Sequence, residues 1–265
     1  MPDGAMRKTL SRRFSAAAST YDDHARVQWA IAQSVAERAR TYLPPPARVL
    51  DIGCGTGAVI QALGPAYERV GLDLSEAMID QASKLHTDDI EWVHTDVLDY
   101  TDERPFDGFL SASTLHWIRP LDQLFVHLHR QLRPDGFLIF ALMLEGSLGE
   151  LNQIRNAIAP DKKNPRLPER QEVSAALNEA GFTLRETCAE KIVQQYPSAH
   201  DFIQALHASG VTARTPTDTL NRRELKAVME SYNRAVQHED QVYATWEVGF
   251  FVAQAADGLP DPINA

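Results

Sequence analysis

The chain has 265 residues, 44% of them hydrophobic, which is enough for one large α/β domain with an insertion. Its 36 acidic and 26 basic residues give a formal charge of −10, which argues against a nucleic-acid substrate bound through a broad basic face. Two cysteines supply neither a disulfide framework nor a metal set, and no apolar run approaches the ~20 residues that span a bilayer. We therefore expect a cytoplasmic protein without nucleic-acid or membrane partners.

The first 45 residues are predicted to form an arm and a helix. Basic residues and Phe14 precede a run of small residues before position 20, which predicts a short helix or a mobile arm. From 23 to about 42, apolar residues recur every four positions and share one helical face: Val27, Ile31 and Val35. Three consecutive prolines at 44–46 then end the helix.

Residues 46–254 are predicted to form the main domain. The apolar period switches regularly, predicting strands at 47–52, 68–73, 90–94, 106–112 and 136–143 and helices at 56–63, 76–86 and 121–132. This alternation predicts a doubly wound, mostly parallel α/β sheet, whose ligand binds at the carboxyl ends of the strands. Arg133-Pro-Asp-Gly136 is predicted to be the turn between the last helix and its strand.

The remainder of the chain is less regular. A helix near 170–180 and an extended stretch at 182–194 precede two helical patterns between 197 and 240, which we interpret as a lid insertion. A final alternating strand at 242–253 is predicted to return to the sheet edge as its seventh strand. Residues 255–265 are expected to be a disordered tail.

One glycine-rich stretch predicts a cofactor site. Residues 49–57 read Val-Leu-Asp-Ile-Gly-Cys-Gly-Thr-Gly, which is typical of a buried strand that turns tightly into a helix facing a nucleotide-like ligand. Spacing alone would also permit a dinucleotide, because Ala58 can stand in for the third glycine of G-x-G-x-x-G.

Three acidic residues favour S-adenosylmethionine over a dinucleotide. Asp51 would repel a pyrophosphate but attract the amino group of S-adenosylmethionine. Asp73 ends the next strand, where it could accept hydrogen bonds from a ribose diol, and Asp96 follows the third strand, where it could accept from the adenine amine. Each alone is typical of a turn or helix cap, but together with the glycine turn they predict an S-adenosylmethionine pocket.

The histidines could bind a ligand or a metal, or could be structural. His116 lies just beyond the fourth predicted strand, where a ligand-site role and a structural role beside Trp117 are equally open. Other histidines, such as His127 and His129, lack acidic or cysteine partners at metal spacing, so we expect no metal.

Taken with Leu132-Arg-Pro-Asp-Gly136, these features make residues 47–143 resemble the class I S-adenosylmethionine-dependent methyltransferases, a Rossmann-like fold. Motifs outside this region narrow the resemblance, over nearly the whole chain, to the malonyl-acyl-carrier-protein O-methyltransferases of biotin synthesis. They are Phe14-Ser-Ala-Ala, Thr20-Tyr-Asp-Asp-His-Ala-Arg-Val-Gln28, Leu115-His-Trp117, Gly146-Ser-Leu-Gly-Glu-Leu151 and Tyr243-Ala-Thr-Trp-Glu-Val. The resemblance implies methylation of the free carboxylate of a malonyl thioester, on an acyl carrier protein or coenzyme A, giving the methyl ester that starts pimeloyl synthesis.

The resemblance also implies a set of site residues. Contacts to S-adenosylmethionine are expected from Tyr21, Gln28, Asp51, Gly53, Gly55, Asp73, Leu74, Asp96, Val97 and Ser111. Tyr21, His116 and His207 are expected to position the acceptor, with no general base, because a carboxylate with a pKa of about 4 is already ionised near pH 7. Two positions depart from the family pattern: Ala112 replaces a frequent Asn, and His207 replaces a Lys before the glycine of the lid helix.

Two other functions remain open from the sequence. A small-acid O-methyltransferase of the trans-aconitate type shares the core and a similar Leu-x-Trp element. A non-catalytic protein that retains the cofactor fold, as related respiratory complex I assembly factors do, would also keep the acids and glycines. The N-terminal Tyr motif and the Gly-Ser-Leu-x-Glu-Leu segment favour the malonyl thioester, and we expect a monomer.

Overall fold

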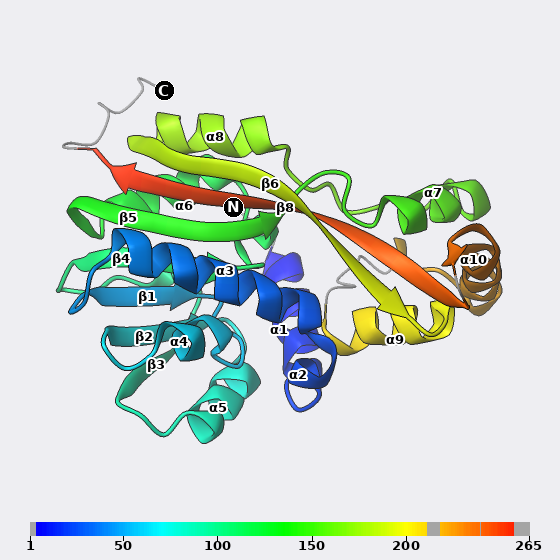
Figure 1. Ribbon diagram of the computed structural model, residues 1–265, viewed down its shortest axis with the longest axis horizontal. Coiled ribbons are helices and arrows are strands. Elements are labelled where there is room, and N and C mark those ends of the chain that lie inside the picture. The colour runs from blue at the N-terminus through cyan, green and yellow to red at the C-terminus, as the bar shows by residue number, and fades with distance from the viewer. Residues whose placement is uncertain (1–3, 211–217, 239, 257–265) are drawn as a thin grey trace.

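The computed structural model describes residues 4–210, 218–238 and 240–256. Seven strands form one sheet in the order β3-β2-β1-β4-β5-β8-β6, and the two-residue strand β7 pairs with β8 (Figure 1). The strands are β1 Arg48–Ile52, β2 Glu68–Asp73, β3 Ile90–His94, β4 Phe106–Ala112, β5 Leu132–Met143, β6 Phe182–Tyr196, β7 Gln237–His238 and β8 Gln241–Ala255. The first five strands of this order are parallel, so the predicted doubly wound, seven-stranded sheet is confirmed.

The α-helices cover both faces of the sheet. They are α1 Gly4–Ala17, α2 Tyr21–His24, α3 Arg26–Tyr42, α4 Ala58–Leu63, α5 Glu76–Leu85, α6 Leu121–His129, α7 Gly149–Ile158, α8 Arg170–Glu179, α9 Ala199–Ala208 and α10 Arg222–Ala235. Short 3-10 helices lie at Val97–Asp99 and Leu115–Trp117. Among the described residues, no helix combines the length and apolar character needed to cross a bilayer.

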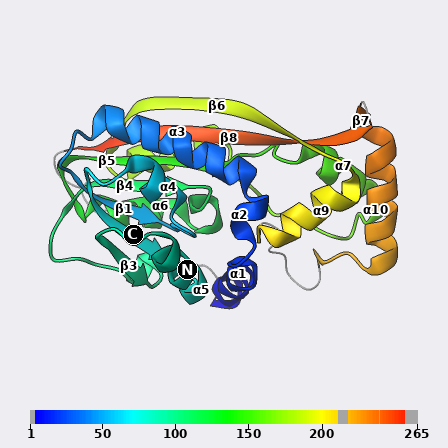
Figure 2. The ribbon, with the colours of Figure 1, turned by 60° about the horizontal axis from the view of Figure 1, so that its bottom comes forward.

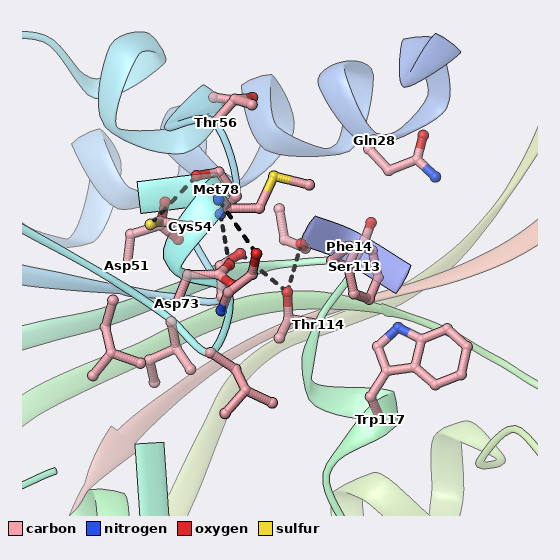
Figure 3. A pocket seen from close by; sticks show the side chains of 18 of the residues that line it. Phe14, Gln28, Asp51, Cys54, Thr56, Asp73, Met78, Ser113, Thr114 and Trp117 are labelled. Carbon is pink, nitrogen blue, oxygen red and sulfur yellow. Dashed lines mark hydrogen bonds between the residues drawn. The ribbon is translucent and has the colours of Figure 1, made fainter. Parts of the chain in front are cut away.

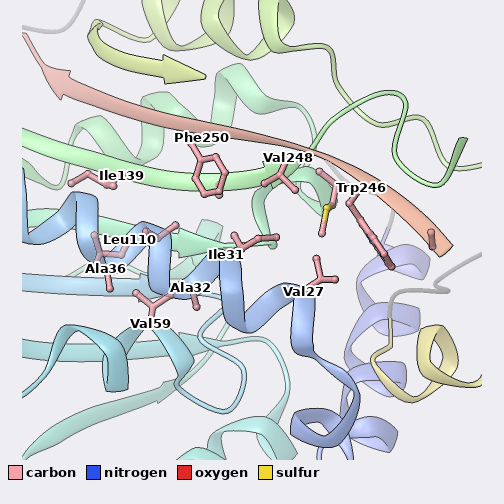
Figure 4. Close-up of a cluster of buried hydrophobic side chains, with 14 of the residues drawn as sticks. Val27, Ile31, Ala32, Ala36, Val59, Leu110, Ile139, Trp246, Val248 and Phe250 are labelled. Atoms are coloured by element: carbon pink, nitrogen blue, oxygen red, sulfur yellow. The ribbon is translucent and has the colours of Figure 1, made fainter. Parts of the chain in front are cut away.

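Helix α3 packs on the sheet through the apolar face predicted for it. Val27, Ile31 and Val35 are at most 4% exposed, and α3 ends at Tyr42, just before the prolines. In Figure 4 this face meets Leu110, Ile139 and Phe250 of three neighbouring strands. Burial of one such Ile or Val side chain contributes about 1.5–3 kcal/mol, so α3 is firmly attached to the sheet. Helices α6 and α8 contribute to a separate apolar cluster.

The last strand is not at the sheet edge, and this prediction was wrong. Strand β8 is antiparallel to both β5 and β6 and lies between them, so β6 forms the edge. The burial of each strand gives the reason. Residues 248–253 of β8 are all buried, as in an inner strand covered on both faces, whereas most of β6 is exposed or half-buried.

The predicted turn at Arg133-Pro-Asp-Gly136 was also wrong. Helix α6 ends earlier, at His129, and β5 starts at Leu132, which pairs with Phe106 of β4. Regular pairing resumes only at Phe137, so residues 133–136 form an irregularity inside the strand, with Asp135 at φ 62°. The Pro, Asp and Gly of this stretch therefore accommodate a bulge and not a turn.

The lid segment (residues 197–240) contains α9 and α10, at the two predicted helical patterns. Both pack against the part of the antiparallel β6–β8 strand pair that extends beyond β5 (Figures 1 and 2). Phe202, Tyr232 and Trp246 are at most 3% exposed and form the centre of this packing. Helix α7, absent from the prediction, packs against α10. The predicted tail starts inside β8 at Ala255, and its residues 257–265 lie outside the described residues, as do 211–217 and 239.

Candidate functional site

The glycine turn between β1 and α4 has the backbone that its sequence requires. Gly53, Gly55 and Gly57 have φ values of 67°, 53° and 91°, in the left-handed region that favours glycine. A Cβ at Gly53 would lie 2.2 Å from Cγ2 of Thr114, whereas a Cβ at Gly55 would meet no atom within 4 Å. The turn therefore packs closely against the loop after β4 at Gly53 and faces open space at Gly55.

The carboxylate of Asp73, at the end of β2, holds the glycine turn in place. Its Oδ2 accepts a hydrogen bond from the amide of Gly55 at 2.9 Å, and its Oδ1 accepts from the amide of Ser75 at 2.8 Å. Burial raises the pKa of Asp73, and the amide hydrogen bonds oppose this effect. Each carboxylate oxygen keeps a further lone pair for a ligand hydroxyl.

Asp51, near the end of β1, is a buried acid whose oxygens have no partner. The residue is 1% exposed, and neither carboxylate oxygen accepts a hydrogen bond. Burial, and then the nearby Asp73, raise the pKa of Asp51 to about 8. A bound cation would supply the missing partner, so an ammonium group fits this position.

Asp96 lies in the loop after β3, at the third point where a strand ends. Its Oδ1 accepts from the amide of Leu98 at 2.9 Å, and its Oδ2 lies 3.0 Å from Nη1 of Arg7 in α1. The hydrogen bond to Leu98 is the cap of a short helix, as the sequence alone allowed. The same residue also lines the cavity described next, so Asp96 caps the short helix and contributes to the candidate ligand site.

These loops enclose one side of a cavity at the carboxyl ends of the parallel strands (Figure 3). Nine of the predicted cofactor residues line it: Tyr21, Gln28, Asp51, Gly53, Gly55, Asp73, Leu74, Asp96 and Val97. Burial, with Asp73 and Asp22 nearby, raises the pKa of Tyr21, so its hydroxyl stays protonated near neutral pH. The lining residues that the structure describes include three carboxylates and no Lys, Arg or His.

Three predicted site residues lie outside the cavity lining. Ser111 is fully buried, and its hydroxyl donates to the carbonyl oxygen of Ile52 at 2.8 Å, so it ties β4 to β1. His116 is 6% exposed beside Trp117, and burial, followed by the charge of Arg119, lowers its pKa to about 3. His207 lies on an exposed side of α9.

Several lining residues were not predicted. Leu10, Ser11 and Phe14 of α1 form one part of the wall, and Trp29 of α3 lies beside Gln28. At the end of β4, the cavity wall is formed by residues 112–114, 117 and 118. The predicted residue in this region, Ser111, is not part of the wall. Phe14 and Trp117 lie in the motifs on which the family resemblance rests, so the sequence could have indicated them as lining residues. Ser113, whose φ is 61°, lies in no such motif, and nothing in the sequence indicated its role.

Comparisons with known proteins agree with this geometry. Residues 50–140 match the family model described as a methyltransferase domain. A solved structure of a putative methyltransferase from Bacillus halodurans C-125 superposes with a TM-score of 0.60 at 18% identity, covering 84% of this chain and 98% of that one. Another, a phosphoethanolamine N-methyltransferase 2 of Haemonchus contortus in complex with S-adenosylhomocysteine, has a TM-score of 0.54 at 18% identity, covering 84% and 52%.

The fold and the site define a class I methyltransferase that uses S-adenosylmethionine. Malonyl-[acyl-carrier protein] O-methyltransferase of Methylococcus capsulatus is 31% identical to the chain over 256 residues, which cover 93% of each protein. The chain therefore belongs to the malonyl-[acyl-carrier protein] O-methyltransferase family, and it is an S-adenosylmethionine-dependent O-methyltransferase.

Proposed function

We propose that the enzyme methylates the free carboxylate of a malonyl group carried as a thioester on an acyl carrier protein, giving the methyl ester used for pimeloyl and biotin synthesis. The names of the relatives support this acceptor over the trans-aconitate type and over a non-catalytic assembly factor. The observation that carries the proposal is the cavity itself, which combines acids suited to the cofactor with neutral and aromatic groups suited to an anionic acyl chain.

The described residues fit S-adenosylmethionine. When bound, this cofactor supplies an electrophilic methyl group on a sulfonium. The unpaired carboxylate of Asp51 would hold the ammonium group, the carboxylate of Asp73 the ribose hydroxyls, and Asp96 with Val97 the adenine. Open space at Gly55 leaves room for the ligand beside the glycine backbone. No group of at least three His, Cys, Asp or Glu side chains that could hold a metal occurs among the described residues.

The acceptor side of the site acts by position and not by proton transfer. A malonyl carboxylate with a pKa of about 4 is ionised near pH 7 and needs no base. The lowered pKa of His116 and its place outside the lining fit this scheme, and the protonated hydroxyl of Tyr21 can donate a hydrogen bond to a carboxylate. The lack of a cation among the described lining residues leaves the carboxylate nucleophilic. Orientation of the reactants can contribute several kcal/mol, about 7–11 at most.

Two covering segments complete the proposal. Residues 1–45 would close over the cofactor, because α1, α2 and α3 all contribute to the cavity wall. The lid segment would close over the acceptor. Its Gly210 lies against Phe14, since a Cβ there would be 2.8 Å from Cδ1 of the Phe14 ring.

We also propose a monomer in the cytoplasm without nucleic-acid or membrane partners, consistent with the charge of −10.

Transfer of label from S-adenosylmethionine to separate acceptors tests this function. The panel contains malonyl-acyl carrier protein, malonyl-coenzyme A and trans-aconitate, with acetyl-acyl carrier protein as a control that lacks the free carboxylate. We expect the highest kcat/KM with malonyl-acyl carrier protein and no transfer to the acetyl carrier. Preferred methylation of aconitate would replace the proposed acceptor, and binding of cofactor without transfer to any acceptor would favour a non-catalytic role.

A further inference from the structure

Helix α1 contacts the cofactor loops, which we define as residues 53–57, 74–75 and 95–96 after strands β1, β2 and β3. The hydroxyl of Ser15 lies 2.8 Å from that of Ser75, and the hydroxyl of Ser11 donates to the carbonyl oxygen of Leu74 at 3.4 Å. From the next helix, Asp22 accepts a hydrogen bond from the hydroxyl of Thr56 at 2.7 Å. The N-terminal helices are therefore bound to the loops after β1 and β2.

Arg7 makes the corresponding contact with the third loop. Its Nη1 lies 3.0 Å from Oδ2 of Asp96 and 3.5 Å from Oδ2 of Asp99. The side chains of Arg7 and Asp96 are only 23% and 14% exposed, whereas that of Asp99 is 70% exposed. An ion pair shielded in this way is screened less by salt than a surface pair, so the Asp96 contact is the stronger of the two.

The contact fixes an acid that faces the cavity. One oxygen of Asp96 accepts from the amide of Leu98 and the other forms the ion pair with Arg7, so the carboxylate is held from both sides while it keeps further lone pairs. The Nε atom of Arg7 is buried and has no hydrogen-bond partner, and Arg7 itself is not among the residues that line the cavity. Its effect on a bound ligand would therefore pass through Asp96.

Helix α1 also forms part of the cavity wall through Leu10, Ser11 and Phe14, of which Figure 3 labels Phe14. A ligand that lies between the cofactor loops and α1 would therefore be covered by this helix on one side. The Arg7 contact is ionic, and it joins α1 to the residue assigned to the adenine.

We propose that Arg7 is a positioning residue of the cofactor site: its ion pair with Asp96 locks α1 over the adenine end of the cavity and slows release of the cofactor. The inference rests on the cofactor part of the proposed function and is independent of the acceptor. It assigns to the first helix a direct part in cofactor retention.

The dissociation rate of S-adenosylhomocysteine tests this lock. Trp29 and Trp117 line the cavity, so their fluorescence can follow binding and displacement in stopped flow. We expect Arg7→Ala to speed dissociation at least about fivefold, because a half-buried ion pair is lost, with a smaller change in the association rate. Arg7→Lys, which retains the charge, should recover part of the slow release. The matched control is Lys8→Ala, because Lys8 is exposed on the same helix and should leave the rate unchanged.

Hydrogen exchange separates the lock from a purely structural role. In wild type, bound S-adenosylhomocysteine should protect the amides of α1, and Arg7→Ala should lose this protection while α3 keeps its own. If Arg7→Ala releases the ligand at the rate of Lys8→Ala, the lock is wrong. If wild type does not bind S-adenosylhomocysteine at all, the proposed function fails instead, so the two failures are distinguishable.

A disulfide between α1 and the loop after β2 tests, without removing Arg7, whether α1 must move before the cofactor is released. The hydroxyls of Ser15 and Ser75 are close enough for a Ser15→Cys, Ser75→Cys pair to form a disulfide after a small adjustment. The oxidised protein, loaded beforehand, should retain S-adenosylhomocysteine through a chase that empties the reduced protein. Equal release from the oxidised and reduced forms would overturn the proposal that α1 must move.

Discussion

Cofactor affinity should depend on pH through Asp51. In the free protein this carboxyl is 1% exposed, lacks hydrogen-bond partners and has its pKa raised to about 8 by burial and by Asp73. Binding of the ammonium group requires the ionised form, which in turn lowers the pKa of Asp51 in the complex. Binding must therefore release a proton below about pH 8, and affinity should rise with pH until that point.

The size of the effect follows from the pKa of the free protein. With a pKa of about 8, roughly one Asp51 in ten is ionised at pH 7, so affinity is about tenfold below its plateau there and about a hundredfold below it at pH 6. These factors correspond to about 1.4 and 2.7 kcal/mol. Asp51→Asn should bind at least about tenfold more weakly than the plateau value and should lose the slope, because the amide does not titrate in this range.

Calorimetric titration with S-adenosylhomocysteine from about pH 6 to 8.5 measures both quantities. In buffers of different ionisation enthalpy, wild type should release about 0.9 proton per ligand at pH 7 and Asp51→Asn close to none. Asp96→Asn is the matched control, expected to bind more weakly but to keep the slope. Affinity that is independent of pH in wild type, or a slope that survives in Asp51→Asn, would refute the assigned role of Asp51.

The same raised pKa has a consequence for the free protein. A group whose pKa is higher in the folded than in the unfolded state contributes stability that is fully present below its unfolded pKa and is lost as pH rises through its folded pKa. For Asp51 this loss runs from about pH 4 to about pH 8. Asp51→Asn without ligand should therefore have a higher Tm than wild type at about pH 8, in contrast to its weaker cofactor binding.

Four further variants test other parts of the site. Asp73→Ala should lower the affinity for S-adenosylhomocysteine at least about tenfold, since charge-assisted bonds of roughly 1.5–3 kcal/mol each are lost; unchanged calorimetric affinity would remove Asp73 from the site. Gly53→Ala should lower the free energy of unfolding by about 2 kcal/mol or more in urea, because the Cβ would overlap Thr114 at φ 67°. Gly55→Ala, with no atom near its Cβ, should lose less. His116→Gln should retain most of kcat, and wild-type kcat should be flat from about pH 6.5 to 8.5; a tenfold rise per pH unit that disappears in His116→Gln would require a histidine base.

The cofactor side of the site was predictable because its signals are local. A buried strand, three glycines and one acid lie within nine consecutive residues, and this pattern is compatible with few backbone structures. Asp73 and Asp96 followed from the rule that parallel strands end at the same edge of a sheet. Asp51, Gly53, Gly55, Asp73 and Asp96 all line one cavity in the structure.

Other features depend on contacts between distant parts of the chain. The position of β8 between β5 and β6 is determined by which strands pair, and alternating hydrophobicity does not reveal pairing. Ser111 was assigned to the pocket by its place at a strand end, but its hydroxyl turns to Ile52 of the neighbouring strand. The contact between Arg7 and Asp96 joins residues 89 positions apart, so one of several basic residues near the N-terminus gave no sign of it.

Helix α7 was missed for a different reason. Leu151, Ile154 and Ile158 recur at helical spacing and pack together in the core, but the helix has only ten residues and lies between a glycine-containing segment and a proline-marked stretch that we interpreted as irregular. Arg155 donates to the carbonyl oxygen of Asp218 at 2.9 Å, and Glu150 accepts from Thr245 at 2.6 Å. Tertiary contacts of this kind stabilise a helix that is too short to be stable on its own.

The proposed methyl transfer is tested by the intact mass of malonyl-acyl carrier protein after incubation with the enzyme and S-adenosylmethionine. We expect the carrier to gain the mass of one CH2 group, located on the malonyl group as a methyl ester, and we expect Asp51→Asn and Asp73→Ala to slow this gain at limiting cofactor. A malonyl carrier that stays at its original mass, while wild type demonstrably binds the cofactor, would show that the enzyme does not methylate this acceptor.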